Sequence, residues 1–199
     1  EDVSTNKTAV VPGELVVRGV VSDAEDPTTE IADTTPTQQV EDVTAQVPAG
    51  TIYKINDSDL AVENQEDVRL LVDSVVPDSN NTLQNAAVSE FEEITDQHEC
   101  EMNYLDLVDT SNGNAWVTAS NDVTVHWPIP ADAADDSEFY IVHYEGLDRN
   151  DNNALGDGVY TPELYSVDEG NLTVDRETGN ITFTVDSFSP FALFYTAEE

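Results

Sequence analysis

The sequence predicts an all-β fold, an immunoglobulin-like (Ig-like) sandwich of two β-sheets with one short helix. Short segments of alternating apolar residues recur along the chain, and clusters of turn residues separate them. Alternation with period two is typical of strands that bury one face, and about nine such strands indicate a sandwich. Residues 179–195 show the pattern most clearly, because the alternation stops at a Ser-Phe-Ser-Pro corner and resumes beyond it. We expect a terminal hairpin there.

The chain divides into two parts at about residue 43. Residues 1–42 hold one candidate strand at 14–21, and from residue 22 to residue 46 the composition is acidic and rich in Thr and Pro. Such a stretch buries too little apolar surface to offset the entropy lost on ordering. We expect residues 1–42 to be an extended linker, or a long loop if the candidate strand docks. Residues 43–199 are the predicted sandwich domain.

Most of the strands are predicted from segments in which apolar and polar residues alternate between clusters of turn residues. Two further strands are predicted from segments that are almost wholly apolar. Residues 68–75 and 139–144 have few polar side chains, which suggests burial on both faces. Asn112-Gly113 is typical of a hairpin turn, and Pro128 and Pro130 end the strand that begins at Val123. The expected strands are 47–51, 52–55, 68–75, 100–108, 123–129, 139–144, 159–167, 172–174 and the terminal pair.

One segment has the spacing of a helix. Residues 77–80 supply turn and N-cap chemistry, and Leu83, Ala86, Ala87 and Phe91 follow with helical periodicity. We expect a short helix that covers one end of a sheet.

The charge of the chain is extreme, with 42 acidic and 6 basic residues and a formal net charge of −36. Nucleic acid and anionic membranes are excluded as ordinary partners, because both require surplus Lys and Arg. No apolar run approaches the ~20 residues that cross a bilayer, so we expect no membrane insertion. The only cysteine, Cys100, forms no internal disulfide, and we expect it half-buried on a strand. The chain begins Glu1-Asp2 without Met, which suggests a piece of a longer protein.

The candidate ligand site is a polar loop that resembles a calcium-binding loop. The first, third and fifth positions carry oxygen ligands, but position six is Asn153 where such loops have Gly, and position twelve is Val159 where they have Glu. The alternative is a loop whose Asn and Asp side chains satisfy their own backbone. Calcium is the one cofactor that the sequence suggests. Its candidate ligands are Asp148, Asn150, Asn152 and Asp157.

The histidines do not indicate a metal site or a catalytic site. His98, His126 and His143 are separated by long stretches and form no zinc pair. Alternation places His126 opposite Val125 and Trp127, so we expect it to face solvent. We expect His143 to pack beside Tyr140 or Tyr144.

No enzyme motif is visible, and we expect no catalytic activity. Lys7 and Lys54 are the lysines available for an isopeptide bond in the core, and Lys54 is the better placed; the alternative is a solvent-facing or salt-bridging lysine. The aromatic residues could form a sugar-binding platform or pack in the core. They are Trp116, Trp127, Tyr140, Tyr144, Tyr160 and Tyr165.

Three segments, 123–130, 138–144 and 181–193, together resemble a domain of large secreted or wall-attached proteins of Gram-positive bacteria. The resemblance covers residues 43–199. That domain is similar to the β-sandwich of ankyrins and netrin receptors. Some members of this wider group cut themselves at a His-Phe-Ser corner, where the His acts as base for the Ser nucleophile. Here the triplet is Ser187-Phe188-Ser189, with Ser in place of the base and Pro190 next. We therefore expect a tight corner between core strands and no cleavage.

The resemblance implies a non-catalytic structural or adhesive module of a larger extracellular protein, either secreted or attached to the cell wall. Such a stalk, spacer or adhesin unit has the neighbouring domains of its own polypeptide as partners. The alternative is a module that binds a host glycan or host protein with the help of calcium. A third interpretation is a domain of a salt-loving organism, in which the acidity is an adaptation to brine.

Overall fold

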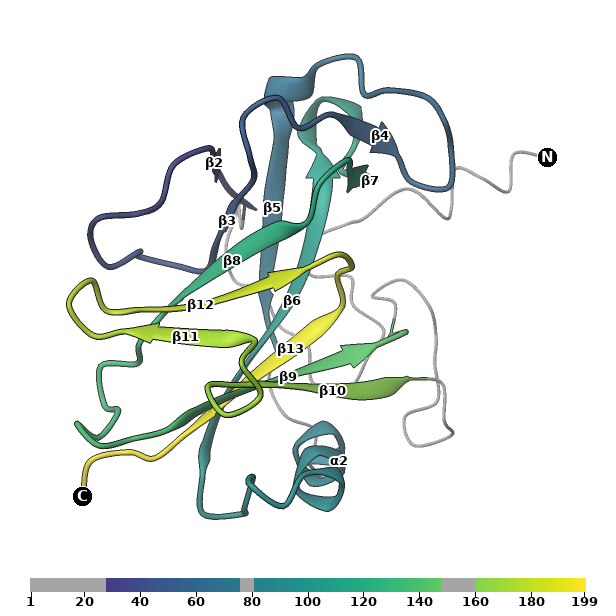
Figure 1. Cartoon of the computed structure of the whole chain (residues 1–199). Helices are drawn as coiled ribbons and strands as arrows, with labels where there is room; N and C mark the ends of the chain where they lie inside the picture. The colour runs from purple at the N-terminus through teal and green to yellow at the C-terminus, as the bar shows by residue number, and fades with distance from the viewer. Residues whose placement is uncertain (1–27, 76–80, 148–159) are drawn as a thin grey trace.

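The computed structural model describes residues 28–75, 81–147 and 160–199. Thirteen strands form two sheets that lie face to face, and one α-helix packs against them (Figure 1). The predicted all-β sandwich with one short helix is confirmed.

The larger sheet has eight strands. Six run in the order β1-β5-β6-β13-β9-β10, while β7 pairs with β6 and β4 pairs with β7, and all these pairs are antiparallel. The strands are β1 (Thr28–Thr29), β4 (Tyr53–Ile55), β5 (Val68–Ser74), β6 (Glu99–Asp109), β7 (Ala115–Ala119), β9 (Phe139–Glu145), β10 (Thr161–Ser166) and β13 (Pro190–Tyr195).

The smaller sheet has five strands in the order β11-β12-β8-β3-β2, and only the β2–β3 pair is parallel. Its strands are β2 (Ile31–Ala32), β3 (Thr44–Gln46), β8 (Val123–Pro128), β11 (Leu172–Asp175) and β12 (Asn180–Val185). Two short 3-10 helices, η1 (Gln65–Asp67) and η2 (Thr110–Asn112), lie before β5 and after β6.

The last two strands do not form the expected hairpin. β12 lies between β11 and β8 in the smaller sheet, whereas β13 lies between β6 and β9 in the larger one. Residues 186–189, which we call the β12–β13 corner, therefore cross from one sheet to the other. Alternating hydrophobicity marks each strand but does not show whether two neighbouring strands share a sheet, and for this reason the hairpin prediction was wrong.

Two hydrophobic cores explain why residues 139–144 are almost all apolar. Phe139 and Ile141 of β9 face the core between the sheets, together with Phe191 of β13. Tyr140 and Val142 face the opposite side. That outer face forms a second core beneath the helix, so β9 is buried on both faces.

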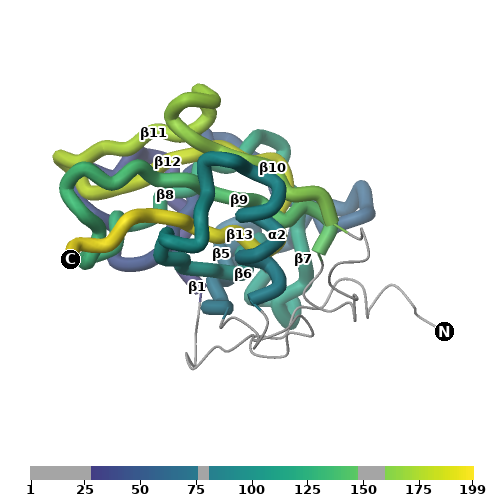
Figure 2. Tube along the Cα trace, turned by 90° about the horizontal axis from the view of Figure 1, so that it is seen from below, coloured from purple at the N-terminus to yellow at the C-terminus, as the bar shows by residue number. Residues whose placement is uncertain are grey.

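The helix α2 (Thr82–Glu90) covers the outer face of the larger sheet (Figures 1 and 2). It buries Leu83 and Ala87, which lie one turn apart. The hydroxyl of Tyr144 donates to the Leu83 carbonyl at 2.7 Å, which fixes the helix above β9. The predicted N-cap segment 77–80 lies outside the described residues.

Part of the acidic segment pairs with the sheets, since β1 lies beside β5 and β2 beside β3. Asn180, at the start of β12, holds residues 38–40 of the same acidic segment. Its Oδ1 accepts from the Val40 N–H at 3.0 Å, and its Nδ2 donates to the Gln38 carbonyl at 2.9 Å. Gly179, with a φ of +82°, lies against Gln39, and a Cβ there would be 3.2 Å from Gln39 Cδ. The candidate strand at 14–21 lies outside the described residues, and the boundary at residue 43 stays a prediction.

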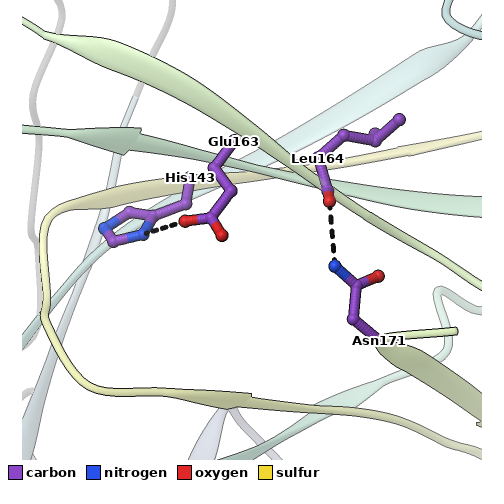
Figure 3. A network of polar contacts seen from close by, with 4 residues as sticks. All are labelled: His143, Glu163, Leu164 and Asn171. Atoms are coloured by element: carbon purple, nitrogen blue, oxygen red, sulfur yellow. Dashed lines mark hydrogen bonds and ion pairs between the residues drawn. The ribbon is translucent and has the colours of Figure 1, made fainter. Parts of the chain in front are cut away.

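The free edge of β10 is closed by a side chain. The Asn171 Oδ1 accepts from the Ser166 N–H at 2.9 Å, and its Nδ2 donates to the Leu164 carbonyl at 3.1 Å (Figure 3). Asn171 therefore takes the place of a neighbouring strand. Pro162, two residues before Leu164, offers no N–H at the same edge. Such features prevent edge-to-edge pairing of strands.

Candidate functional site

A cleft of about 450 Å³ opens where β6, β7, the end of β9 and the β12–β13 corner meet. Four carboxylates line it, and each comes from a different part of the chain. Asp106 lies on β6 and is only 8% exposed, whereas Asp122, Glu145 and Asp186 are exposed at the ends of strands. Among the described residues that line the cleft, none is Lys, Arg or His. Its walls are therefore strongly negative.

Trp116 on β7 supplies an aromatic surface in the cleft. The ring is half-buried and packs against Leu71 and Val108. Its Nε1–H is buried and has no hydrogen-bond partner. An indole N–H can only donate, and carboxylates can only accept. The cleft therefore suits a ligand that is rich in hydroxyl or amine groups and carries no negative charge.

The four carboxylates of the cleft are not grouped as metal ligands among the described residues. In residues 28–75, 81–147 and 160–199, no group of three or more His, Cys, Asp or Glu side chains is arranged to hold a metal ion. The calcium-loop candidates lie outside the described residues, and calcium binding there stays a prediction. These are Asp148, Asn150, Asn152 and Asp157.

His126 does not face solvent, contrary to the expectation from alternation. It is 3% exposed, and both ring nitrogens have partners: Nδ1 lies 2.9 Å from Thr182 Oγ1, and Nε2 lies 2.8 Å from Gln46 Oε1. Burial lowers the pKa of the ring. β8 is the central strand of the smaller sheet, so side chains of β3 and β12 cover its outer face.

His143 is also buried, at 1% exposure, but it packs against neither Tyr140 nor Tyr144. Its ring stacks on Phe191 with centroids 4.2 Å apart, and its Nδ1 lies 3.9 Å from Glu163 Oε2 (Figure 3). The two tyrosines point to the opposite face of β9, toward α2. Burial lowers the pKa of His143 to about 4.

Among the described residues, no base is positioned to activate Ser189 in the β12–β13 corner. Ser189 is 1% exposed, and its hydroxyl has no hydrogen-bond partner. The Nε2 of His143 has none either, so the two groups are not bonded to each other. A serine nucleophile requires a base within hydrogen-bond reach. The serine hydroxyl therefore has no base positioned to activate it in this conformation.

The other residues singled out in the sequence have ordinary structural surroundings. Lys54 is exposed on β4, outside the core where an isopeptide bond would form, and Lys7 lies outside the described residues. Cys100 is half-buried on β6, as expected, and burial raises the pKa of its thiol to about 12. Such a thiol is a poor nucleophile. The aromatic platform does not form, because four of its six candidates are buried in the cores: Trp127, Tyr140, Tyr144 and Tyr165.

Comparisons of the chain with protein-family models, curated proteins and solved structures find no match. In the described part of the chain, no helix combines the length and the hydrophobicity needed to cross a membrane.

Proposed function

We propose that the chain is a non-catalytic structural module, a stalk, spacer or adhesin unit, of a larger extracellular bacterial protein that is secreted or attached to the cell wall. The observation that carries this proposal is the position of β13. All six of its side chains are buried, and it is hydrogen-bonded along both edges, to β6 and to β9. A force along this strand would load both rows of hydrogen bonds at once.

The residues after β13 strengthen this attachment. The Thr196 carbonyl accepts from the Ala134 N–H at 2.8 Å, and the Glu198 N–H donates to the Asp132 carbonyl at 2.8 Å. The Tyr195 hydroxyl also donates to Asp132 Oδ1 at 2.8 Å. Chain ends fray unless they are tied down, and here the segment that follows the central strand is tied to the loop before β9. The arrangement suits a unit that transmits tension to its neighbours.

The net charge of −36 supports the same function. Like-charged surfaces remain soluble and repel one another, which keeps adjacent modules of one polypeptide from sticking together.

Single-molecule force spectroscopy on the full chain, held at its two ends, tests the proposal. We expect one cooperative unfolding step that releases most of the roughly 600 Å that ~170 extended residues span. Leu193→Ala on β13 should lower the unfolding force more than Leu172→Ala on the edge strand β11, although both leucines are buried. Unfolding in several small steps, or equal effects of the two substitutions on the unfolding force, would contradict the proposal that β13 resists the applied force.

A second candidate function is a binding module for a host glycan or host protein, and the cleft with its half-buried Trp116 favours it. The chain has two tryptophans, and Trp127 is 1% exposed, so a ligand in the cleft should change the fluorescence of Trp116 alone. Titration with a panel of neutral saccharides and of lysine-containing peptides, with and without a calcium chelator, would detect it. A response that Trp116→Phe abolishes supports binding in the cleft, and no response to any probe argues against it.

A further inference from the structure

His143 is a titratable side chain inside the core between the two sheets. Its register partner on β13 is Phe191 and on β10 is Glu163, so the ring lies between an apolar and an acidic neighbour. The stack with Phe191 is nearly parallel, with an interplanar angle of 11°. A neutral imidazole is well suited to such a position, because it packs like a small aromatic ring.

The two ring nitrogens of His143 lack the partners that a charged ring needs. Nδ1 is 3.9 Å from Glu163 Oε2, which is too long for a hydrogen bond, and Nε2 is buried with no partner among the described residues. A protonated imidazole has two N–H donors. Leaving such donors buried without acceptors is costly, and burying the charge adds to the cost. His126 provides the contrast, since both of its nitrogens are within bonding distance of an oxygen.

The charged groups around His143 are carboxylates at the rim of the core. Glu163 faces the ring from β10, and Asp186 of the β12–β13 corner acts on it electrostatically. Burial raises the pKa of the neighbouring Tyr165, and both carboxylates, together with Glu145 at the end of β9, raise it further. The Glu163 side chain is 50% exposed, and Asp186 and Glu145 are exposed, so water screens their attraction for a buried cation. Desolvation therefore outweighs these charges.

We propose that His143 is a proton-operated latch: the neutral ring holds the β12–β13 corner and β10 against the core, and the protonated ring opens this end of the sandwich. A charged ring reaches water and the carboxylates of Glu163 and Asp186 only by leaving Phe191. That movement loosens β9 from the start of β13, which follows the corner directly. β5 and β6 are not paired with β9, so this part of the larger sheet stays closed.

The direction of the pH effect follows from proton binding. An unfolded histidine has a pKa of about 6.5, and that of folded His143 is about 4. Between these values the unfolded or open chain holds one proton more than the closed chain, so stability falls as the pH is lowered through this window. Above about pH 6.5 the ring is neutral in both states and the latch is closed.

The test compares the native chain with His143→Phe, which keeps a ring on Phe191 and does not titrate. Urea unfolding of both proteins is measured at about pH 7 and about pH 5 at fixed ionic strength. When the pH falls from 7 to 5, the unfolding equilibrium constant of the native chain should rise by a factor about 20 times larger than that of the variant. The two proteins carry the same carboxylates, so the difference between them reports the change at position 143. His98→Gln is the control for the loss of a histidine as such, because His98 is partly exposed and lies outside β9, β10 and β13. Equal pH dependence of the native chain and His143→Phe would overturn the proposal.

Two measurements on the native protein keep the proposal testable if the variant does not fold. The ring protons of His143, followed by NMR, should titrate well below the ordinary histidine pKa of about 6.5; titration near that value would refute the latch. Hydrogen exchange at about pH 5 should increase in β10 and the β12–β13 corner before it increases in β5 and β6. A uniform increase over all strands would mean global acid unfolding, and would also refute it.

Discussion

Asn180 joins residues 38–40 to the smaller sheet, and its replacement by alanine shows how firmly this segment is held. Asn180→Ala removes two hydrogen bonds, to the Val40 N–H and the Gln38 carbonyl. Each bond contributes about 1 kcal/mol net. Asn180 is 3% exposed and Val40 is half-buried, so water replaces the lost partner poorly on the Val40 side. The expected loss of unfolding free energy is about 2 kcal/mol, equivalent to a fall of about 4–8 °C in Tm for a chain of this size.

The assay combines urea unfolding with hydrogen exchange at the Val40 amide, which should lose its protection in the variant. Asn121→Ala is the matched control, because the Asn121 amide also makes two side-chain hydrogen bonds but is exposed. It should cost well under 1 kcal/mol. If Asn180→Ala costs as little as Asn121→Ala, and exchange at Val40 is unchanged, then the segment is not held to β12 in the way we describe.

Three further predictions concern the edge, the core and the charge. Asn171→Ala exposes the outward groups of Leu164 and Ser166, and sedimentation velocity should show more self-association than for the native chain; equal association of the two proteins would contradict this role. Phe191→Ala empties a fully buried site and should cost about 3–5 kcal/mol in urea unfolding, whereas a cost below about 1 kcal/mol would mean that the core closes over the gap. A net charge of −36 over 10586 Å² places net charges about 17 Å apart, which is about twice the Debye length in physiological salt but inside the ~30 Å length at 0.01 M. Tm should therefore rise when salt is added to dilute buffer, and rise further with calcium. Equal Tm values in dilute buffer, in salt and in calcium would contradict this prediction.

The strands that carry the fold were predictable because their hydrophobic patterns are unambiguous. Residues 139–144 are nearly all apolar, and the structure buries β9 on both faces, between the inner core and α2. The two-residue strands β1 and β2 could not be predicted, because two residues contain no period. β7 was also missed, since only Trp116 and Val117 are large apolar residues in it.

The positions of individual side chains were less predictable, because they depend on neighbours that are distant in the sequence. His126 is covered by Gln46 and Thr182, which come from two other strands. The cleft is likewise built from Asp106, Trp116 and Asp186, and no local pattern connects these residues. With 42 acidic residues, the only available signal, carboxylates at strand ends, occurs too often to be informative.

The place of β13 between β6 and β9 has a consequence for the order of folding. β6 and β9 each lack one neighbour until β13, the last of the described strands, inserts between them. As the chain is made from its N-terminus, the larger sheet remains in two unconnected halves until this strand is available, and long-range pairing of this kind is slow. Synthesis would therefore proceed with the larger sheet open, and its closure would come as one late, cooperative step.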